Sequence, residues 1–254
     1  MANIISCRTG VFGALPDAFA TLAAAGVRYA EVPRPADGDY QAMADLAAAH
    51  GITIMTIAGP LKLDTDETMQ AYLPVIDGAR SIGVAKLFFS AGSGPDVPRV
   101  VALERLRTVV RYAESRGITL CLETHPPFGV NADVARQTIE AIGSDSLRWN
   151  YDTANIYYYN EGLDGLTELK KIAPLVGAVH LKDTDGRFKG PIFPVFGTGI
   201  VDFPGVFRHL GDLGFEGPYT LEIEGENVAK LDQAGRKDFL HQCLAALRRF
   251  GAMA

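Results

Sequence analysis

The sequence alternates short β-rich runs with helical patterns along its length, and this alternation constrains the fold more than any other feature. Eight runs are rich in apolar and β-forming residues; they lie at residues 3–6, 27–32, 52–58, 85–91, 118–124, 147–152, 176–182 and 219–224. Almost every gap between them carries a helical pattern. Repeated strand–helix units form parallel strands with right-handed crossovers. Eight such units in 254 residues predict a closed (β/α)8 TIM barrel of the α/β class rather than an open doubly wound sheet.

The helical pattern is clearest over residues 100–117. There Leu103, Leu106, Val110 and Ala113 fall on one helical face, and Gly117 stands where the helix would end. A second helix is expected after Asn131, which has the side chain of a good N-cap. No linker, low-complexity tract or composition shift interrupts the pattern. We therefore predict one domain, residues 1–254, whose 48% hydrophobic composition can fill one large core.

The charge balance argues against a nucleic-acid partner. The net charge is -6 and the pI is near 5.4, whereas proteins that bind a phosphate backbone usually carry a clustered basic face. No apolar run approaches the ~20 residues needed to span a bilayer, and the N-terminus lacks a basic region followed by a long apolar one. We expect a cytoplasmic protein that acts on a small molecule, with no membrane partner. The sequence leaves open whether it forms a homo-oligomer.

The three cysteines do not indicate a disulfide framework or a thiolate metal site. Cys7, Cys121 and Cys243 are odd in number, have unrelated spacings and form no CxxC pair. Reduced, buried thiols are the expectation.

Four consecutive runs end in, or carry near their ends, a side chain that can bind a metal. They are Glu123, Asp152, His180 and Glu222. In a barrel the carboxyl ends of neighbouring strands converge on the active site. Three carboxylates that meet in a partly dry pocket would repel one another, whereas one divalent cation satisfies them together. Oxygen ligands with one nitrogen and no thiolate suit Mn, Mg or Co and tolerate Zn.

Four motifs resemble those of a known family. "LETHP", "YDTAN", "HLKD" and "GPYTLEIE" are similar to the strand-end motifs of the sugar phosphate isomerase/epimerase branch of the xylose isomerase-like TIM-barrel superfamily. "AGVRYAEV" and "FGTGIVDFPGVFRHL" extend the resemblance over nearly the whole chain. One departure is Ala154, where the family often has Gly.

The resemblance implies roles for the strand-end residues. Glu123, Asp152, His180 and Glu222 match the metal ligands, with one metal, Mn first, per site. Glu123 and Glu222 also match the catalytic glutamates that exchange protons with carbon from opposite sides of the substrate.

Further residues match positions that contact substrate. His125 matches a histidine that contacts substrate hydroxyls, although it could instead bond only the backbone of its loop. Glu31 is similar to a substrate-side glutamate, although an ion pair with Arg34 or Arg8 is the alternative.

Several strand-end neighbours keep two interpretations each. Lys182 alternates to the same face as His180, so it could stabilise an enediolate or neutralise the excess of carboxylates. Asp183 is expected to support the loop rather than bind metal. Glu224 could compete with Glu222 as ligand, and the resemblance favours Glu222. Tyr157 and Phe193 are candidates to cover a sugar face.

Proton abstraction beside a carbonyl is the chemistry that these residues predict. The first hypothesis is a metal-dependent ketose epimerase or aldose/ketose isomerase that acts on a sugar or sugar-like hydroxy ketone through an enediolate. The alternative is a lyase with the same first step, such as a keto-inositol or dehydroshikimate-type dehydratase or an enzyme that cleaves 3-keto-glycosides.

Two other classes fit the sequence less well. A DNA-repair nuclease of the endonuclease IV type would use many strand-end histidines, and the acidic charge balance opposes DNA binding. A barrel that binds sugar without turnover would not need the full set of predicted ligands. The sequence has no Gly-rich phosphate loop, and only Arg187 and Lys189 follow the seventh run as candidate phosphate partners, so we expect unphosphorylated substrates.

Overall fold

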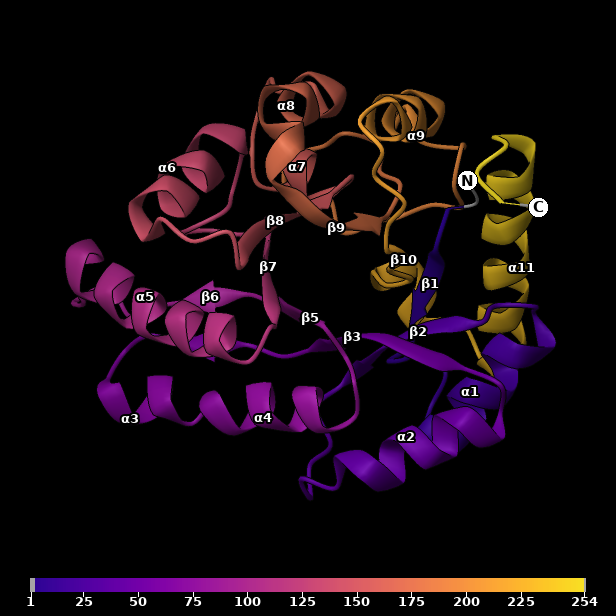
Figure 1. Ribbon diagram of the computed structural model, residues 1–254. Coiled ribbons are helices and arrows are strands. Elements are labelled where there is room, and N and C mark those ends of the chain that lie inside the picture. The colour runs from indigo at the N-terminus through magenta and orange to yellow at the C-terminus, as the bar shows by residue number, and fades with distance from the viewer. Residues whose placement is uncertain (1–2, 254) are drawn as a thin grey trace.

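Eight parallel strands close into a barrel in the computed structural model, which describes residues 3–253 (Figure 1). The order around the barrel is β1-β10-β9-β8-β7-β5-β3-β2. Every neighbouring pair is parallel, including β1 with β10, which closes the ring. The strands are β1 (Ile5–Arg8), β2 (Tyr29–Pro33), β3 (Thr53–Ala58), β5 (Lys86–Phe89), β7 (Thr119–Glu123), β8 (Leu147–Asp152), β9 (Val176–Leu181) and β10 (Tyr219–Leu221). The predicted (β/α)8 barrel is confirmed.

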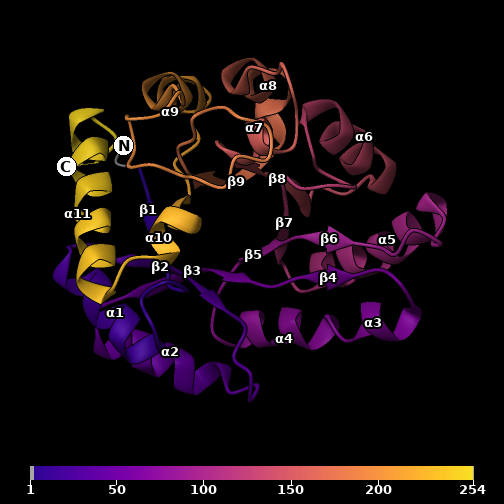
Figure 2. The same cartoon turned by 180° about the vertical axis from the view of Figure 1, so that it is seen from behind.

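Helices surround the barrel on its outside (Figures 1 and 2). They are α1 (Leu15–Ala24), α2 (Tyr40–Ala49), α3 (Asp66–Gln70), α4 (Leu73–Ser81), α5 (Arg99–Ser115), α6 (Ala132–Ile142), α8 (Gly165–Ile172), α9 (Phe203–Asp212) and α11 (Gln233–Arg249). Shorter elements are α7 (Asn155–Tyr158), the 3-10 turn η1 (Ala173–Leu175), α10 (Glu226–Ala229) and a two-stranded sheet of β4 (Leu61–Lys62) with β6 (Ala91–Gly92). The β4–β6 sheet, α7 and α10 follow the carboxyl ends of barrel strands, so they build the end of the barrel where a site is expected (Figure 2).

The predicted helices form where their patterns place them. Residues 100–116 lie in or directly after α5, which buries Leu106, Val110 and Ala113. The side chain of Asn131 caps α6 by accepting a hydrogen bond from the backbone of Val134 at 3.0 Å. Both results follow from local sequence signals, an apolar stripe and a capping side chain.

Most strands differ from the predicted runs by one or two residues at an end, and the differences at β1 and β10 affect the site. The first strand extends to Arg8, beyond the run at residues 3–6, because Cys7 and Arg8 pair with Ala30 and Glu31 of β2. The last strand ends at Leu221, so Glu222 and Glu224 lie in the segment that follows it. Glu222 still donates its backbone N–H to Leu181 at 3.0 Å, which fixes its position against β9.

One glycine allows the barrel strands to pack. A β-carbon at Gly177 in β9 would lie 2.5 Å from Cβ of Arg148 and 3.1 Å from Sγ of Cys121. Real β-carbons do not approach other carbons that closely, so the position requires Gly. Cys7, Cys121 and Cys243 are free and buried, as predicted. Within residues 3–253, no helix is both long and apolar enough to cross a membrane.

Asp183 organises the long connection between β9 and α9. Its buried carboxylate accepts four backbone N–H groups: Oδ1 from Thr184 (2.9 Å) and Val201 (3.2 Å), and Oδ2 from Gly197 (2.8 Å) and Gly199 (2.9 Å). The loop therefore folds around this side chain, which agrees with the supporting role expected for it.

Replacing Asp183 with Asn tests this loop anchor. In either orientation, the amide NH2 of Asp183→Asn would face two backbone donors that now meet an oxygen. We expect the free energy of unfolding to fall by about 1–3 kcal/mol, the usual cost of leaving buried groups unpaired. Urea denaturation followed by circular dichroism measures the change. Asp185→Asn in the same loop is the matched control, because Asp185 is exposed; equal midpoints for the two variants would contradict the anchor.

Candidate active site

A cavity of about 480 Å³ lies over the carboxyl ends of the barrel strands. Its walls come from the ends of β1, β5, β7 and β10 and from the segments that follow β8 and β9. The lining residues are Arg8, Phe88, Ser90, Glu123, His125, Asn155, Tyr158, Tyr159, Pro191, Phe193, Glu222, Glu224, Gly225 and Glu226. The cavity is in the range typical of small-molecule sites.

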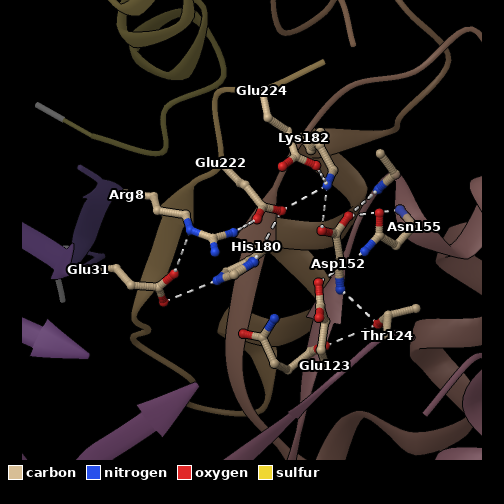
Figure 3. A network of polar contacts seen from close by, with 12 residues as sticks. Arg8, Glu31, Glu123, Thr124, Asp152, Asn155, His180, Lys182, Glu222 and Glu224 are labelled. Carbon is tan, nitrogen blue, oxygen red and sulfur yellow. Dashed lines mark hydrogen bonds and ion pairs between the residues drawn. The ribbon is translucent and has the colours of Figure 1, made fainter. Parts of the chain in front are cut away.

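The four residues predicted as metal ligands meet at the floor of this end of the barrel (Figure 3). Glu123, Asp152, His180 and Glu222 are all buried, and each offers a ligand atom within 4.8 Å of the others. They come from four neighbouring staves, β7, β8, β9 and the residue after β10. Asp152 and His180 are direct partners in the β8–β9 ladder. Parallel strand order thus assembles residues that are far apart in the sequence.

Asp152 is fixed by the start of α7. Its Oδ1 accepts the backbone N–H groups of Ala154 and Asn155, each at 2.8 Å. Ala154 contributes only its backbone here, so the departure from Gly does not disturb the contact. Oδ2 has no hydrogen-bond partner within residues 3–253 and lies 3.2 Å from Nζ of Lys182. Burial raises the pKa of Asp152 to about 7 despite this lysine.

Glu123 is held by two neutral donors. Ser90 donates its hydroxyl to Oε2, and the side-chain amide of Asn155 donates to Oε1 at 3.3 Å. Burial, followed by the negative charge of Glu222, raises the pKa of Glu123. A positive charge at the centre of the group would therefore stabilise its ionised form.

Glu222 is held by cations instead. Arg8 donates to Oε1, and Lys182 donates to Oε2 at 2.8 Å. Burial alone would raise the pKa of Glu222, but Lys182, His180 and Arg8 outweigh burial and hold it well below its usual range. The two predicted catalytic glutamates thus occupy opposite electrostatic environments within one cluster.

His180 is oriented by Glu31. Its Nε2 lies 3.1 Å from Oε2 of Glu31, which also accepts the hydroxyl of Thr56 at 2.8 Å. Because a carboxylate only accepts, Nε2 carries the hydrogen and Nδ1 is left to face Oε2 of Glu222 at 3.3 Å. Burial opposes a charge on His180, but Glu31 and Glu222 outweigh it and raise its pKa. A proton and a metal therefore compete for Nδ1.

The donor set fits a divalent cation. Asp152 Oδ2 and His180 Nδ1 are buried atoms with no hydrogen-bond partner in the described chain, and both belong to the cluster. Glu31 bonds Nε2 of His180, the ring nitrogen that does not face Glu222. A carboxylate in this position typically orients a metal-binding histidine. Three carboxylates and one imidazole favour a hard or borderline metal. These four residues are able to hold one such ion.

Lys182 neutralises carboxylates beside this cluster. Its buried Nζ contacts Asp152 Oδ2, Glu222 Oε2 and Glu224 Oε1, the last at 2.6 Å, and lies 4.7 Å from the ring centroid of Phe193. Glu222 and Glu224 line the cavity, whereas Lys182 is not among the residues that line it. Charge neutralisation, one of its two expected roles, is what the structure shows, and a contact with substrate stays a prediction.

The other two predicted substrate residues lie at different depths. His125 lines the cavity, and its Nδ1 lies 2.6 Å from the carbonyl oxygen of Pro126. The carbonyl can only accept, so Nδ1 carries the hydrogen and Nε2 is an acceptor when the ring is neutral. Glu31 is buried between His180 and Arg8, whose Nε is 3.7 Å away. The alternative ion pair with Arg8 is thus present, and a direct contact of Glu31 with substrate stays a prediction.

Aromatic rings form one wall of the cavity. Tyr158, Tyr159 and Phe193 line it, and Tyr159 packs edge-on against His125 with centroids 4.9 Å apart. Phe193 was expected there. The expectation for Tyr157 is wrong, because its hydroxyl points to α8 and accepts the backbone N–H of Gly165 at 3.0 Å. The helical turn of α7 presents the next two tyrosines instead.

Sequence reasoning missed several residues of the site. Asn155 contacts two of the four clustered residues, and Ser90 and Arg8 contact one each; Arg8 was expected only as a possible ion-pair partner of Glu31. Tyr158 and Tyr159 line the cavity. Arg8 and Ser90 stand at or just past the ends of β1 and β5, so a rule covering all eight strand ends would have found them. Asn155 follows the "YDTA" segment, where a helix start could have been expected.

Known proteins are similar to this chain in sequence and in fold. The family model described as xylose isomerase-like TIM barrel matches residues 19–244. Inosose dehydratase of Klebsiella pneumoniae subsp. pneumoniae is 30% identical over 139 residues, covering 48% of this chain and 46% of that protein. The match thus spans about half the length of this curated relative.

Solved structures match over nearly the whole chain. A xylose isomerase domain protein from Planctomyces limnophilus has a TM-score of 0.82 at 22% identity, covering 98% of both chains. L-ribulose 3-epimerase has a TM-score of 0.74 at 23% identity, covering 98% of this chain and 97% of that one. An IOLI protein with a bound zinc atom has a TM-score of 0.78 at 15% identity, covering 97% of both. These identities establish the fold alone. Because the family model spans most of the closed barrel, the chain belongs to the xylose isomerase-like TIM-barrel family.

Proposed function

We propose that the protein is a divalent-metal-dependent isomerase or epimerase of a sugar or sugar-like hydroxy ketone. The observation that carries the proposal is the pair of buried glutamates, Glu123 and Glu222, that share one cation-binding cluster and both line the cavity. An epimerase that removes a proton from one face of a carbon and returns it to the other face can use two such groups within reach of one substrate.

The metal would be held by Glu123, Asp152, His180 and Glu222, with Mn as the first choice and Mg, Co or Zn as alternatives. Bound there, a divalent ion would polarise a substrate carbonyl and acidify the neighbouring C–H group. Glu31 keeps Nδ1 of His180 directed at the cluster, and the backbone at the start of α7 keeps Asp152 in place.

Glu123 and Glu222 would move the proton. Each has a carboxylate at the cavity wall, and each is fixed by partners on its other side, Ser90 and Asn155 for Glu123 and Arg8 and Lys182 for Glu222. Fixed carboxylates lose little orientational freedom when substrate binds. Either glutamate can take the proton, and the other can return it from the opposite side.

The remaining cavity walls would orient the substrate. Nε2 of His125 can accept a hydrogen bond from a hydroxyl group. Tyr158, Tyr159 and Phe193 offer ring faces and edges that cover the C–H surface of a sugar and exclude water. Mixed aromatic and polar walls of this kind suit a polyhydroxylated ligand.

A lyase is the second candidate. The sequence similarity to inosose dehydratase favours it, although that similarity covers about half of either chain. Both reactions begin with the same proton abstraction. A lyase then expels a group from the next carbon, whereas an isomerase or epimerase returns a proton.

Product analysis in deuterated water tests the proposed function. With Mn added, we expect at least one ketose from a panel that includes D-fructose, L-ribulose and D-allulose to yield an isomeric sugar that carries deuterium beside the carbonyl. Proton NMR and mass spectrometry measure this. If 2-keto-myo-inositol lost water while every sugar remained unchanged, the lyase would replace the isomerase.

Metal binding is tested separately from turnover. We expect about one divalent ion per chain after EDTA treatment and Mn re-addition, measured by elemental analysis. Glu222→Gln should weaken Mn binding by at least tenfold because it removes a charged ligand, whereas Glu224→Gln should change it only a few-fold. Three metals per chain, none at any Mn concentration, or equal defects in these two matched variants would contradict the assigned cluster.

Glutamine variants separate proton transfer from metal binding. At saturating Mn, Glu123→Gln and Glu222→Gln should lose turnover by at least ~100-fold, the low end of what general acid–base catalysis contributes. Asp152→Asn removes no proton carrier, so excess Mn should restore much of its activity. Steady-state kinetics across a Mn series makes the comparison. Full activity of both Gln variants at saturating Mn would rule out the two-glutamate mechanism.

A further inference from the structure

A second, smaller cavity of about 280 Å³ adjoins the candidate active site. The two cavities share three wall residues, Arg8, Phe88 and Ser90. Otherwise the smaller cavity is walled by Gly10, Pro33, Ala58, Gly59 and Pro60. None of the four clustered residues lines it. The smaller cavity is thus adjacent to the site yet chemically different, with mostly apolar walls.

Arg8 lines both cavities, and its side chain lies between Glu31 and Glu222 (Figure 3). Its Nη1 is taken by Glu222 and its Nε faces Glu31, while its guanidinium carbon lies 5.6 Å from the ring centroid of Phe88. Nη2 of Arg8 has no hydrogen-bond partner within residues 3–253. The Arg8 side chain is 36% exposed although both carboxylate partners are buried. A fixed guanidinium with free donors therefore faces the space that a ligand would occupy.

The hydroxyl of Ser90 is not free to donate a hydrogen bond to a ligand. It donates to Glu123 instead. Arg8 is thus the donor on the shared wall that remains free for a ligand oxygen. Beyond it, a ligand would meet the carbon surfaces of Pro33, Ala58, Pro60 and Phe88, which offer no hydrogen bond.

The charge of the main cavity disfavours an anionic ligand. Among the described residues that line it, Glu123, Glu222, Glu224 and Glu226 carry negative charge and Arg8 carries positive charge. The buried Asp152 adds one negative charge beside them, and Lys182 adds one positive charge. With a divalent ion, Arg8 and Lys182 present, these groups would still carry one net negative charge. A phosphate group would bring further negative charge into a site that is already acidic.

We propose that Arg8 and the smaller cavity form a specificity subsite for the tail of a neutral, unphosphorylated substrate whose far end is apolar. Arg8 donates to a substrate oxygen at the boundary between the cavities, and the carbon-lined space beyond it takes a deoxygenated or alkylated end. The subsite rests on the proposed function, because the other end of the substrate lies over the four clustered residues.

Calorimetric titration of the Mn-loaded protein with four probes tests the subsite. The probes are dihydroxyacetone, D-fructose, 6-deoxy-D-fructose and D-fructose 6-phosphate. We expect 6-deoxy-D-fructose to bind about tenfold more tightly than D-fructose, because the terminal hydroxyl would be buried without a partner. D-fructose 6-phosphate should bind most weakly of the six-carbon probes, and dihydroxyacetone should be too short to extend into the smaller cavity.

Two variants locate the effect. Gly10→Val places a side chain at the smaller cavity, where a β-carbon meets no atom within 4 Å. This variant should weaken the binding of both unphosphorylated six-carbon probes at least fivefold and leave the binding of dihydroxyacetone unchanged. Arg8→Lys keeps a charge beside Glu222 but loses the fork of donors. It should weaken the same two probes more than dihydroxyacetone, whereas a defect that acts only through Glu222 would weaken all probes equally.

The outcomes separate this inference from the proposed function. If the wild type binds D-fructose but neither variant discriminates by chain length, or if the 6-phosphate binds best, the subsite is wrong and the proposed function stands. If the Mn-loaded wild type binds none of the four probes, the proposed sugar substrate fails and the subsite fails with it.

Discussion

The structure depends on how a buried group of carboxylates is neutralised at one end of the barrel. Glu31, Glu123, Asp152 and Glu222 are all nearly inaccessible to water, where an unpaired negative charge is very costly. Lys182 and Arg8 offset part of this charge, and the pKa values of Glu123 and Asp152 rise because the offset is incomplete. These four carboxylates face two permanently charged cations, so the cluster lacks two positive charges when His180 is neutral. A divalent cation would supply both charges beside Asp152 Oδ2 and His180 Nδ1, which have no hydrogen-bond partner among the described residues.

Barrel closure is what makes this arrangement possible. His180 on β9 and Glu31 on β2 lie 149 residues apart in the sequence, and their strands are not neighbours in the sheet. They meet because both side chains point to the inside of the same ring. Arg8 on β1 lies between these staves and contacts Glu31 and Glu222. Each supporting contact therefore depends on the register of several strands, which a packed barrel fixes.

Much of the fold and the centre of the site could be predicted from the sequence, for a specific reason. Strands that end in Glu123 or Asp152 show a change from apolar to polar residues, and parallel strand ends converge. The features that the sequence did not predict depend on strand pairing, on the phase of a helical turn or on contacts across the barrel. The exact end of β1 is set by pairing with β2, so the sequence suggested Arg8 only as a possible partner of Glu31 and not as a contact of Glu222. The choice between Tyr157 and its two successors depends on the phase of one helical turn. The burial of Glu31 beneath His180 depends on contacts across the barrel, which strand order alone does not specify.

In the proposed subsite, the Arg8 side chain would connect substrate recognition to the four clustered residues. One face of its guanidinium is held by Glu222 and Glu31, and Glu31 in turn orients His180, so a ligand oxygen that binds Arg8 is two contacts away from the histidine. Rigid charged partners cost little entropy to maintain, and they fix the distance between the substrate tail and the reacting carbon. Differences among related barrels in the residue at the end of the first strand would then change which tail is accepted and also the contact that holds Glu222. In the proposed mechanism, selectivity and proton transfer are linked, because Arg8 faces the space proposed for the substrate tail and also holds Glu222.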